Sequence, residues 1–124
     1  MPYIVESNGP VSVTRQIRLE AERRIAKGIL VNGRTFRADD ASTQRMGEVL
    51  QSFRDGLIDA DGATFRTAAG DIVTLRSVDE ARRVFDAQRR YRTACLASSA
   101  ALQQNPPKDI PNDRNWPAPE RVDL

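Results

Sequence analysis

Apolar residues along this chain follow a helical spacing in three segments and alternate with polar residues in two others. The helical spacing covers residues 13–27, 40–55 and 78–103, and the third of these segments is long enough to extend about 40 Å. Gly28 is a natural stop for the first helix, and Asp39 or Asp40 can cap the second. Ser77, three residues before Glu80, predicts a capping box at the start of the third helix.

The two alternating segments each predict a β-hairpin. In the first, Asn32-Gly33 separates residues 29–31 from residues 34–37 and suits a type I′ turn. In the second, Gly70-Asp71 lies near a turn between residues 63–66 and 72–75. The predicted fold is therefore α+β: two β-hairpins, which can pair into one small antiparallel sheet, with three helices, the last one long. The predicted core consists of Ile29, Val31, Phe36, Met46, Val49, Leu50, Phe53, Phe65, Val73, Leu75, Val84 and Phe85.

The pattern divides the chain into an extended N-terminal arm (residues 1–12), a single α+β domain (13–103) and a proline-rich C-terminal tail (104–124). The tail holds five of the seven prolines and no periodic apolar pattern. Such a segment is expected to be extended on its own and to be held by neighbouring subunits, with Trp116 as an anchor. Deleting residues 105–124 is accordingly expected to leave the domain folded and to abolish partner binding.

Composition excludes several kinds of chemistry. The 124 residues include no histidine and one cysteine, so nucleophile–histidine pairs and internal disulfides are excluded. No nucleotide-binding or zinc motif is present, and neither cofactor nor metal is predicted. A net charge of +2, from 19 basic and 17 acidic residues, does not indicate nucleic-acid binding. No apolar run approaches membrane-spanning length and no secretory signal is evident, so no membrane partner is expected.

Acidic residues leave two chemical alternatives open. The DADG segment at 59–62 resembles the start of a calcium loop, but the ligands that should follow it are absent. A small hydrolase with paired carboxylates, drawn from Asp39, Asp40, Asp59 and Asp61, remains an alternative function. Helix capping and turn formation explain the same acids without catalysis, so no catalytic residue is predicted. Cys95, on the apolar side of the third helix, is interpreted as a buried small residue.

Arginine dominates the basic residues, because 17 of the 19 are Arg. Arginine is favoured at protein interfaces, although codon usage or a solvated helix face would also explain the excess. The second half of the third helix, TACLASSAALQQ, is apolar or small nearly all round, which predicts packing against its own domain at the start and against another chain further on. The predicted partner-binding residues are Arg82, Arg83, Arg89, Arg90, Tyr91, Leu102, Ile110 and Trp116.

Several of these features together resemble a small domain of unknown function from tailed bacteriophages and prophages. The resemblance covers about residues 20–102. It lies in the helix ending at Gly28, the strand with Asn32-Gly33, and the G-x-x-V-T-L run that begins at Gly70. The other matching residues are Ile29, Val31, Phe36, Ala38, Asp39, Asp40, Ser42, Val73, Thr74 and Leu75. These are turn, cap and strand residues, and the resemblance implies no catalytic residues.

The resemblance implies a place among tail and tail-fibre proteins. The predicted function is a non-enzymatic virion protein of the tail or baseplate region, which links fibre or baseplate components as part of a homo- or hetero-oligomeric assembly. A tail-fibre assembly chaperone that leaves before the virion matures is the alternative.

Overall fold

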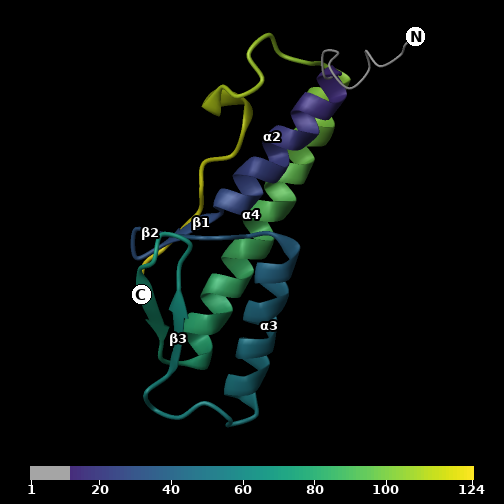
Figure 1. Ribbon diagram of the computed structural model, residues 1–124. Helices are drawn as coiled ribbons and strands as arrows, with labels where there is room; N and C mark the ends of the chain where they lie inside the picture. The colour runs from purple at the N-terminus through teal and green to yellow at the C-terminus, as the bar shows by residue number, and fades with distance from the viewer. Residues whose placement is uncertain (1–11) are drawn as a thin grey trace, which may run out of the picture.

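A computed structural model describes residues 12–124 and shows an α+β fold (Figure 1). The helices are α2 (Val13–Lys27), α3 (Asp40–Arg54), α4 (Val78–Gln104) and the short 3₁₀ helix η1 (Asp113–Asn115). The strands are β1 (Ile29–Val31), β2 (Arg34–Phe36), β3 (Ala63–Arg66), β4 (Ile72–Leu75) and β5 (Arg121–Val122). The long helix α4 organises the molecule, because α2 packs beside its C-terminal half and α3 beside its N-terminal half.

The predicted helix caps are confirmed at α3 and α4. The Asp39 carboxylate accepts a hydrogen bond from the Ser42 N–H (3.0 Å), and the Ser77 hydroxyl accepts one from the Glu80 N–H (3.2 Å). The second half of the capping box differs from the expected form. Glu80 accepts from the Arg76 N–H at 2.7 Å, so its carboxylate satisfies a donor one residue before the cap.

The strands form two separate sheets, so the possibility that both hairpins share one sheet is wrong. One sheet has the order β2-β1-β5, with β1 antiparallel to β2 and parallel to β5; the other is the β3–β4 hairpin. The β1–β2 turn has the predicted left-handed residues, Asn32 (φ 51°) and Gly33 (φ 79°). The hairpins meet through side chains: the Phe36 and Phe65 rings lie edge to face, with centroids 6.0 Å apart.

The core consists of two clusters. The larger one lies among α3, α4 and both sheets, and eight predicted members are buried in it: Ile29, Val31, Phe36, Met46, Leu50, Val73, Leu75 and Val84. The other four, Val49, Phe53, Phe65 and Phe85, are partly buried against it. The smaller cluster consists of Ile17, Ala21, Ile110 and Trp116, with Leu102 beside it. This second cluster is not among the predicted core residues.

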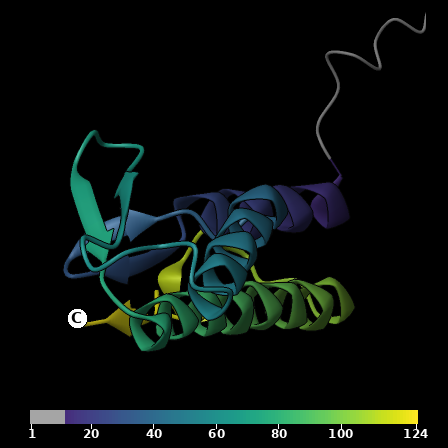
Figure 2. The ribbon, with the colours of Figure 1, turned by 90° about the horizontal axis from the view of Figure 1, so that it is seen from below.

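The C-terminal segment packs against its own chain, which corrects the prediction of an extended tail held by other subunits. After α4 it turns back along α2 and reaches the first sheet, where β5 pairs with β1 (Figure 1). The N–H groups of Leu30 and Asn32 donate to the carbonyls of Glu120 and Val122, both at 2.9 Å. From below, α2 and α4 lie side by side and the β3–β4 hairpin stands at one side of the helices (Figure 2).

Two other expectations concern the ends and the membrane. The predicted N-terminal arm lies outside the described residues, except for Ser12, whose hydroxyl accepts a hydrogen bond from the Arg15 N–H and caps α2. Between residues 12 and 124, no helix is both long enough and apolar enough to cross a bilayer.

Candidate functional site

Two of the predicted partner-binding arginines, Arg82 and Arg89, are exposed on the surface of α4, and their ion pairs and ring contact are with residues of this helix. Arg82 forms an exposed ion pair with Asp79 (2.7 Å), and the Arg89 guanidinium lies 5.2 Å from the centroid of the Phe85 ring. Asp86 lies between them, 3.9 Å from each guanidinium. These contacts lie on one helix surface and leave more than half of each arginine side chain exposed. Both arginines can therefore contact another molecule.

The other two arginines are used within the chain. The Arg83 guanidinium donates a hydrogen bond to the Asp123 carbonyl (2.7 Å), and Arg90 forms an ion pair with Glu120. The Glu120 carboxylate raises the pKa of Arg90, so this guanidinium stays charged. Arg83 and Arg90 therefore fasten the C-terminal segment to α4, a role that the sequence analysis did not assign to them.

The aromatic and aliphatic members of the predicted set are not a free surface. Tyr91, Ile110 and Trp116 are 3–8% exposed, and Leu102 is partly buried beside Trp116. The Trp116 indole N–H donates to the Ile110 carbonyl at 2.8 Å. Their proposed role as partner anchors is wrong in this conformation, since each is covered by the same chain. Trp116 was predicted to anchor the tail to a neighbouring subunit, but it packs against α2 of its own chain.

An ion network centred on the buried Glu20 and Arg24 joins α2 to the C-terminal segment. Arg24 donates to Glu20 (2.7 Å), to the Pro111 carbonyl and to the Asp113 carboxylate (both 2.8 Å). The hydrogen bonds that Arg23 donates to Glu20, together with the one from Arg24, lower the pKa of Glu20 despite its burial. Arg24 also lies 5.6 Å from the Trp116 ring centroid. This network is structural, because its charges are paired with one another.

The candidate hydrolase acids serve local structure. Asp39 caps α3, and the Asp59 carboxylate accepts from the Asp61 N–H (2.9 Å) within a turn. Asp40 lies 3.5 Å from Arg92. Among residues 12–124, no three acidic or sulfur-bearing side chains converge as a metal site. Cys95 is fully buried, and burial raises its pKa, so its thiol is not activated.

Asp39 gives a testable pH dependence. Burial opposes its charge, but hydrogen bonds from Ser42 and Arg37 outweigh burial and lower its pKa to about 2. Because the folded pKa lies below the unfolded value of about 3.9, Asp39 stabilises the fold above about pH 4, and this contribution is lost as the pH falls towards 2. We expect Asp39→Ala to lower the free energy of unfolding by about 1–2 kcal/mol at pH 7.

Urea unfolding of the wild type, Asp39→Ala and Asp39→Asn between pH 2 and 7 measures this effect. Asn can still cap the helix but carries no charge, so Asp39→Asn should lose less stability at pH 7 and respond less to pH. Equal pH profiles for the wild type and Asp39→Asn would contradict the assignment.

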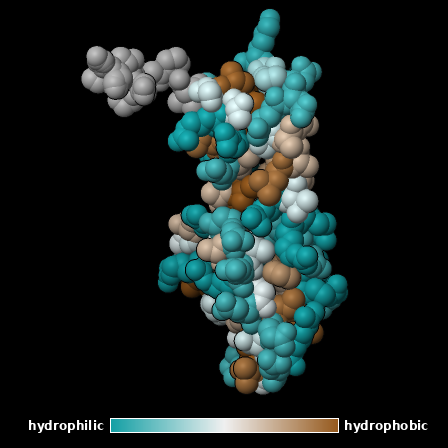
Figure 3. Space-filling model, turned by 90° about the vertical axis from the view of Figure 1, so that its right-hand side faces the viewer, coloured by the Kyte–Doolittle hydropathy of each residue, from teal (hydrophilic) through white to brown (hydrophobic). Residues whose placement is uncertain are grey.

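An uncovered stripe follows α4 along its solvent side, which we call the outer face of α4. Its residues lie on one side of the helix and are exposed or half-exposed: Arg82, Asp86, Arg89, Thr93, Leu96, Ala97 and Ala100. Leu96 is 49% exposed. The stripe changes from charged to apolar along the helix. Apolar surface is also visible over the upper half of the helical side (Figure 3).

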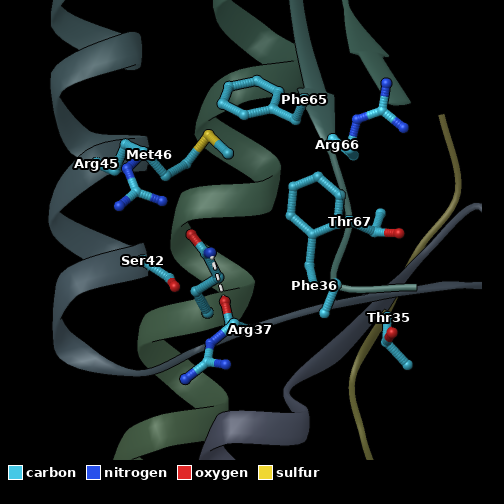
Figure 4. A pocket seen from close by; sticks show the side chains of 11 residues that line it. Thr35, Phe36, Arg37, Ser42, Arg45, Met46, Phe65, Arg66 and Thr67 are labelled. Carbon is cyan, nitrogen blue, oxygen red and sulfur yellow. Dashed lines mark hydrogen bonds between the residues drawn. The ribbon is translucent and has the colours of Figure 1, made fainter. Parts of the chain in front are cut away.

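A second candidate site is a pocket of about 100 Å³ between the start of α3, the end of β2 and β3 (Figure 4). Its lining includes Phe36, Arg45, Met46, Phe65 and Gln88. The Gln88 amide donates to the Arg37 carbonyl at 2.9 Å, while its Oε1 is buried without a hydrogen-bond partner in the described chain. Sequence analysis missed this site, although Gln88 is a polar residue in the otherwise small or apolar seam of α4 that faces the core.

Comparison with known proteins identifies a family but no activity. The model of a domain of unknown function, DUF4376, matches residues 10–115. No curated protein and no solved structure matches the chain. The match includes α2, α3, α4 and both hairpins, and it ends one residue before Trp116 and before β5. Because the match covers most of the sequence, the chain belongs to the DUF4376 family.

Proposed function

We propose that this protein is a non-enzymatic structural component of a bacteriophage tail or baseplate, which binds other tail proteins through the outer face of α4. The resemblance of residues 20–102 to tailed-phage domains supports the context. The outer face of α4 carries the proposal of binding, because its arginines and its exposed Leu96 are not covered by the rest of the described chain.

The chemistry of the outer face suits a protein partner. Arg82 and Arg89 offer planar donors for acidic side chains, and the small residues beyond them allow a second helix to approach closely. Asp39 caps a helix, Asp59 accepts a hydrogen bond within a turn, and Cys95 is buried with a raised pKa. Because these side chains already serve the fold, binding is favoured over catalysis. Exposed ion pairs such as Arg82–Asp79 contribute little to folding, so these arginines can exchange partners at small cost.

Purified phage particles provide the test. We expect quantitative mass spectrometry to find the protein in wild-type particles, and the double variant Arg82→Glu/Arg89→Glu to reduce its amount there by about tenfold. The matched control is Arg15→Glu/Arg54→Glu, which makes the same charge change at exposed positions on α2 and α3 and should be incorporated normally.

The alternative, a tail-fibre assembly chaperone, predicts a different distribution. The protein would then be present in the lysate bound to a fibre protein and absent from purified particles. Absence from the particles would overturn the structural role, and equal incorporation of both double variants would overturn the assignment to the outer face of α4.

A further inference from the structure

We propose that the pocket above Gln88 binds a partner segment that inserts a tyrosine side chain next to an acidic residue. The inference concerns a different surface from the outer face of α4, and it does not depend on where the protein acts. It rests on three properties of the pocket: an unpartnered acceptor, a volume that limits what can enter, and the charge at the entrance.

The first property of the pocket is the unpartnered acceptor, the Oε1 atom of Gln88. Gln88 is 1% exposed, and its Nε2 is held by the Arg37 carbonyl, so the amide orientation is fixed and Oε1 is left without a donor. A buried acceptor without a partner is unfavourable, because the group has lost its hydrogen bonds to water and gained none in return. A ligand that brings an O–H or N–H group removes this cost, whereas an apolar ligand of the same shape does not.

The size and walls of the pocket select one side chain. A cavity of about 150 Å³ is large enough for benzene, so a pocket of about 100 Å³ with an open side admits a single ring and excludes a nucleotide or a large cofactor. Phe36 and Phe65 form one wall, and Met46 lies across from them (Figure 4). An aromatic ring packs favourably against both kinds of side chain. A phenol combines such a ring with an O–H group that can donate a hydrogen bond to the Gln88 Oε1 atom.

The entrance favours an acidic neighbour. The side chain of Arg45, on α3, makes no hydrogen bond or ion pair with any of residues 12–124, so its charge is uncompensated there. Arg37 also lines the pocket, but it shares its charge with Asp39 at 2.8 Å. Arg66 turns away from the pocket and donates to the Gly70 carbonyl (3.3 Å). An aspartate or glutamate beside the tyrosine would therefore meet Arg45 first.

The burial of the Gln88 Oε1 atom adds a requirement. Because Oε1 has almost no exposed surface, the phenol reaches it only when a lining side chain moves. Met46 is unbranched and can change rotamer with little strain, which suits it to this movement. Binding should therefore change the environments of Met46 and Gln88 together.

The experiment uses the purified full-length protein and fluorescein-labelled five-residue peptides. The probe has a central tyrosine with two acidic residues on each side; one control replaces tyrosine by phenylalanine, and another replaces the acidic residues by lysine. We expect saturable binding of the probe by fluorescence anisotropy, binding of the phenylalanine peptide that is up to about tenfold weaker, and no binding of the lysine peptide. In ¹⁵N NMR spectra, the side-chain amide of Gln88 should shift on addition of the probe.

Protein variants assign the binding to the pocket. Arg45→Glu should weaken the probe at least about fivefold and reduce its salt dependence, whereas Arg15→Glu, a remote charge change of equal size, should leave the affinity unchanged within twofold. Gln88→Leu should abolish the preference for tyrosine over phenylalanine; the phenylalanine peptide and the NMR shift test the same contact without altering the protein, should this variant not fold.

Three results would overturn the proposal: no saturable binding of the probe at millimolar concentration, equal affinity for the tyrosine and phenylalanine peptides, or equal weakening by Arg45→Glu and Arg15→Glu. Binding of N-acetyl-tyrosinamide as tightly as the probe would also overturn it, because the pocket would then recognise a small phenol and not a peptide segment.

Discussion

Deletion of residues 105–124 is expected to leave the chain largely unfolded at 37 °C, and not folded as the sequence alone predicted, because the tail packs against its own chain. The deletion removes Ile110, Trp116 and Val122, which are 5–8% exposed, and uncovers Ile17, which is fully buried. Burial of a large apolar side chain contributes about 1.5–3 kcal/mol, so the loss amounts to about 5 kcal/mol or more. The free energy of unfolding of an ordinary domain is only about 5–15 kcal/mol. The deletion also leaves Arg24 without Asp113 and the Pro111 carbonyl.

Circular dichroism and calorimetry on the full-length and truncated proteins measure this effect. Trp116→Ala removes the largest side chain that the tail buries. It should lower the free energy of unfolding by about 3–5 kcal/mol, which corresponds to a fall in Tm of at least about 10 °C. Trp116→Phe is the matched control, because it keeps an aromatic ring in the cluster while it loses the hydrogen bond to Ile110 and part of the ring contact with Arg24. A truncated chain that melts with the full-length protein would show that the tail is dispensable for folding.

Trp116 also provides its own reporter, since it is the only tryptophan in the sequence. Its fluorescence follows the docking of the tail on α2, while circular dichroism follows the helices. If the tail belongs to the cooperative unit, the two signals should change at the same urea concentration. A fluorescence transition that precedes the helical one would show that the tail detaches independently.

Gly28→Ala is expected to be the most destabilising glycine substitution in the first half of the domain, with a loss of at least about 3 kcal/mol. Gly28 has φ 82° and ψ −148°, a conformation that only glycine adopts readily. A Cβ at this position would lie 1.7 Å from the Phe36 carbonyl oxygen and 2.8 Å from the Arg37 Cα. Both are backbone atoms, so relief of the clash requires the helix end and β2 to separate.

Gly33→Ala separates the effect of a steric clash with neighbouring backbone atoms from the effect of a positive φ angle. Gly33 has nearly the same φ, 79°, but apart from Gly33 itself and its two chain neighbours no described heavy atom lies within 4 Å of the position that an alanine methyl group would take. Its substitution should cost only about 1–2 kcal/mol. Urea unfolding of both variants gives the comparison, and equal losses would show that the close approach at Gly28 is not what requires glycine there.

Local signals in the sequence were sufficient for the elements of residues 13–104. Asn32-Gly33 identified its turn because the backbone there requires two positive φ angles, and Ser77 identified the start of α4 because its hydroxyl satisfies a free N–H group. Both features depend on residues that are close in sequence. The bounds of β3 and β4 follow in the same way from alternation between two turns.

The C-terminal segment could not be placed by such signals. β5 has two residues, and its pairing with β1 depends on contacts across most of the chain. Proline-rich composition indicated an extended conformation but not the surface that it follows. Trp116 was recognised as an anchor because of its residue type, while its binding surface, formed by Ile17 and Ala21 on α2, is a product of the tertiary fold.

The candidate sites were predictable to different degrees. Arg82 and Arg89 follow from helical periodicity and are exposed as expected. The pocket above Gln88 could not be derived, because it forms only when α3, α4 and the second hairpin come together. A glutamine within an apolar seam indicates that its side-chain amide makes a buried hydrogen bond, but it does not indicate which of the two amide atoms has a partner.

The parallel pairing of β5 with β1 has a kinetic consequence. The Leu124 N–H donates to the Asn32 side chain 92 positions away, so the third strand joins only after a very long segment has closed. The entropy cost of closing a segment grows only slowly with its length, so the free energy of unfolding is little affected. The folding rate is affected more, because contacts between residues distant in sequence form slowly. Refolding should therefore show fast formation of helical signal followed by slower protection of the Leu30 and Asn32 amides from hydrogen exchange.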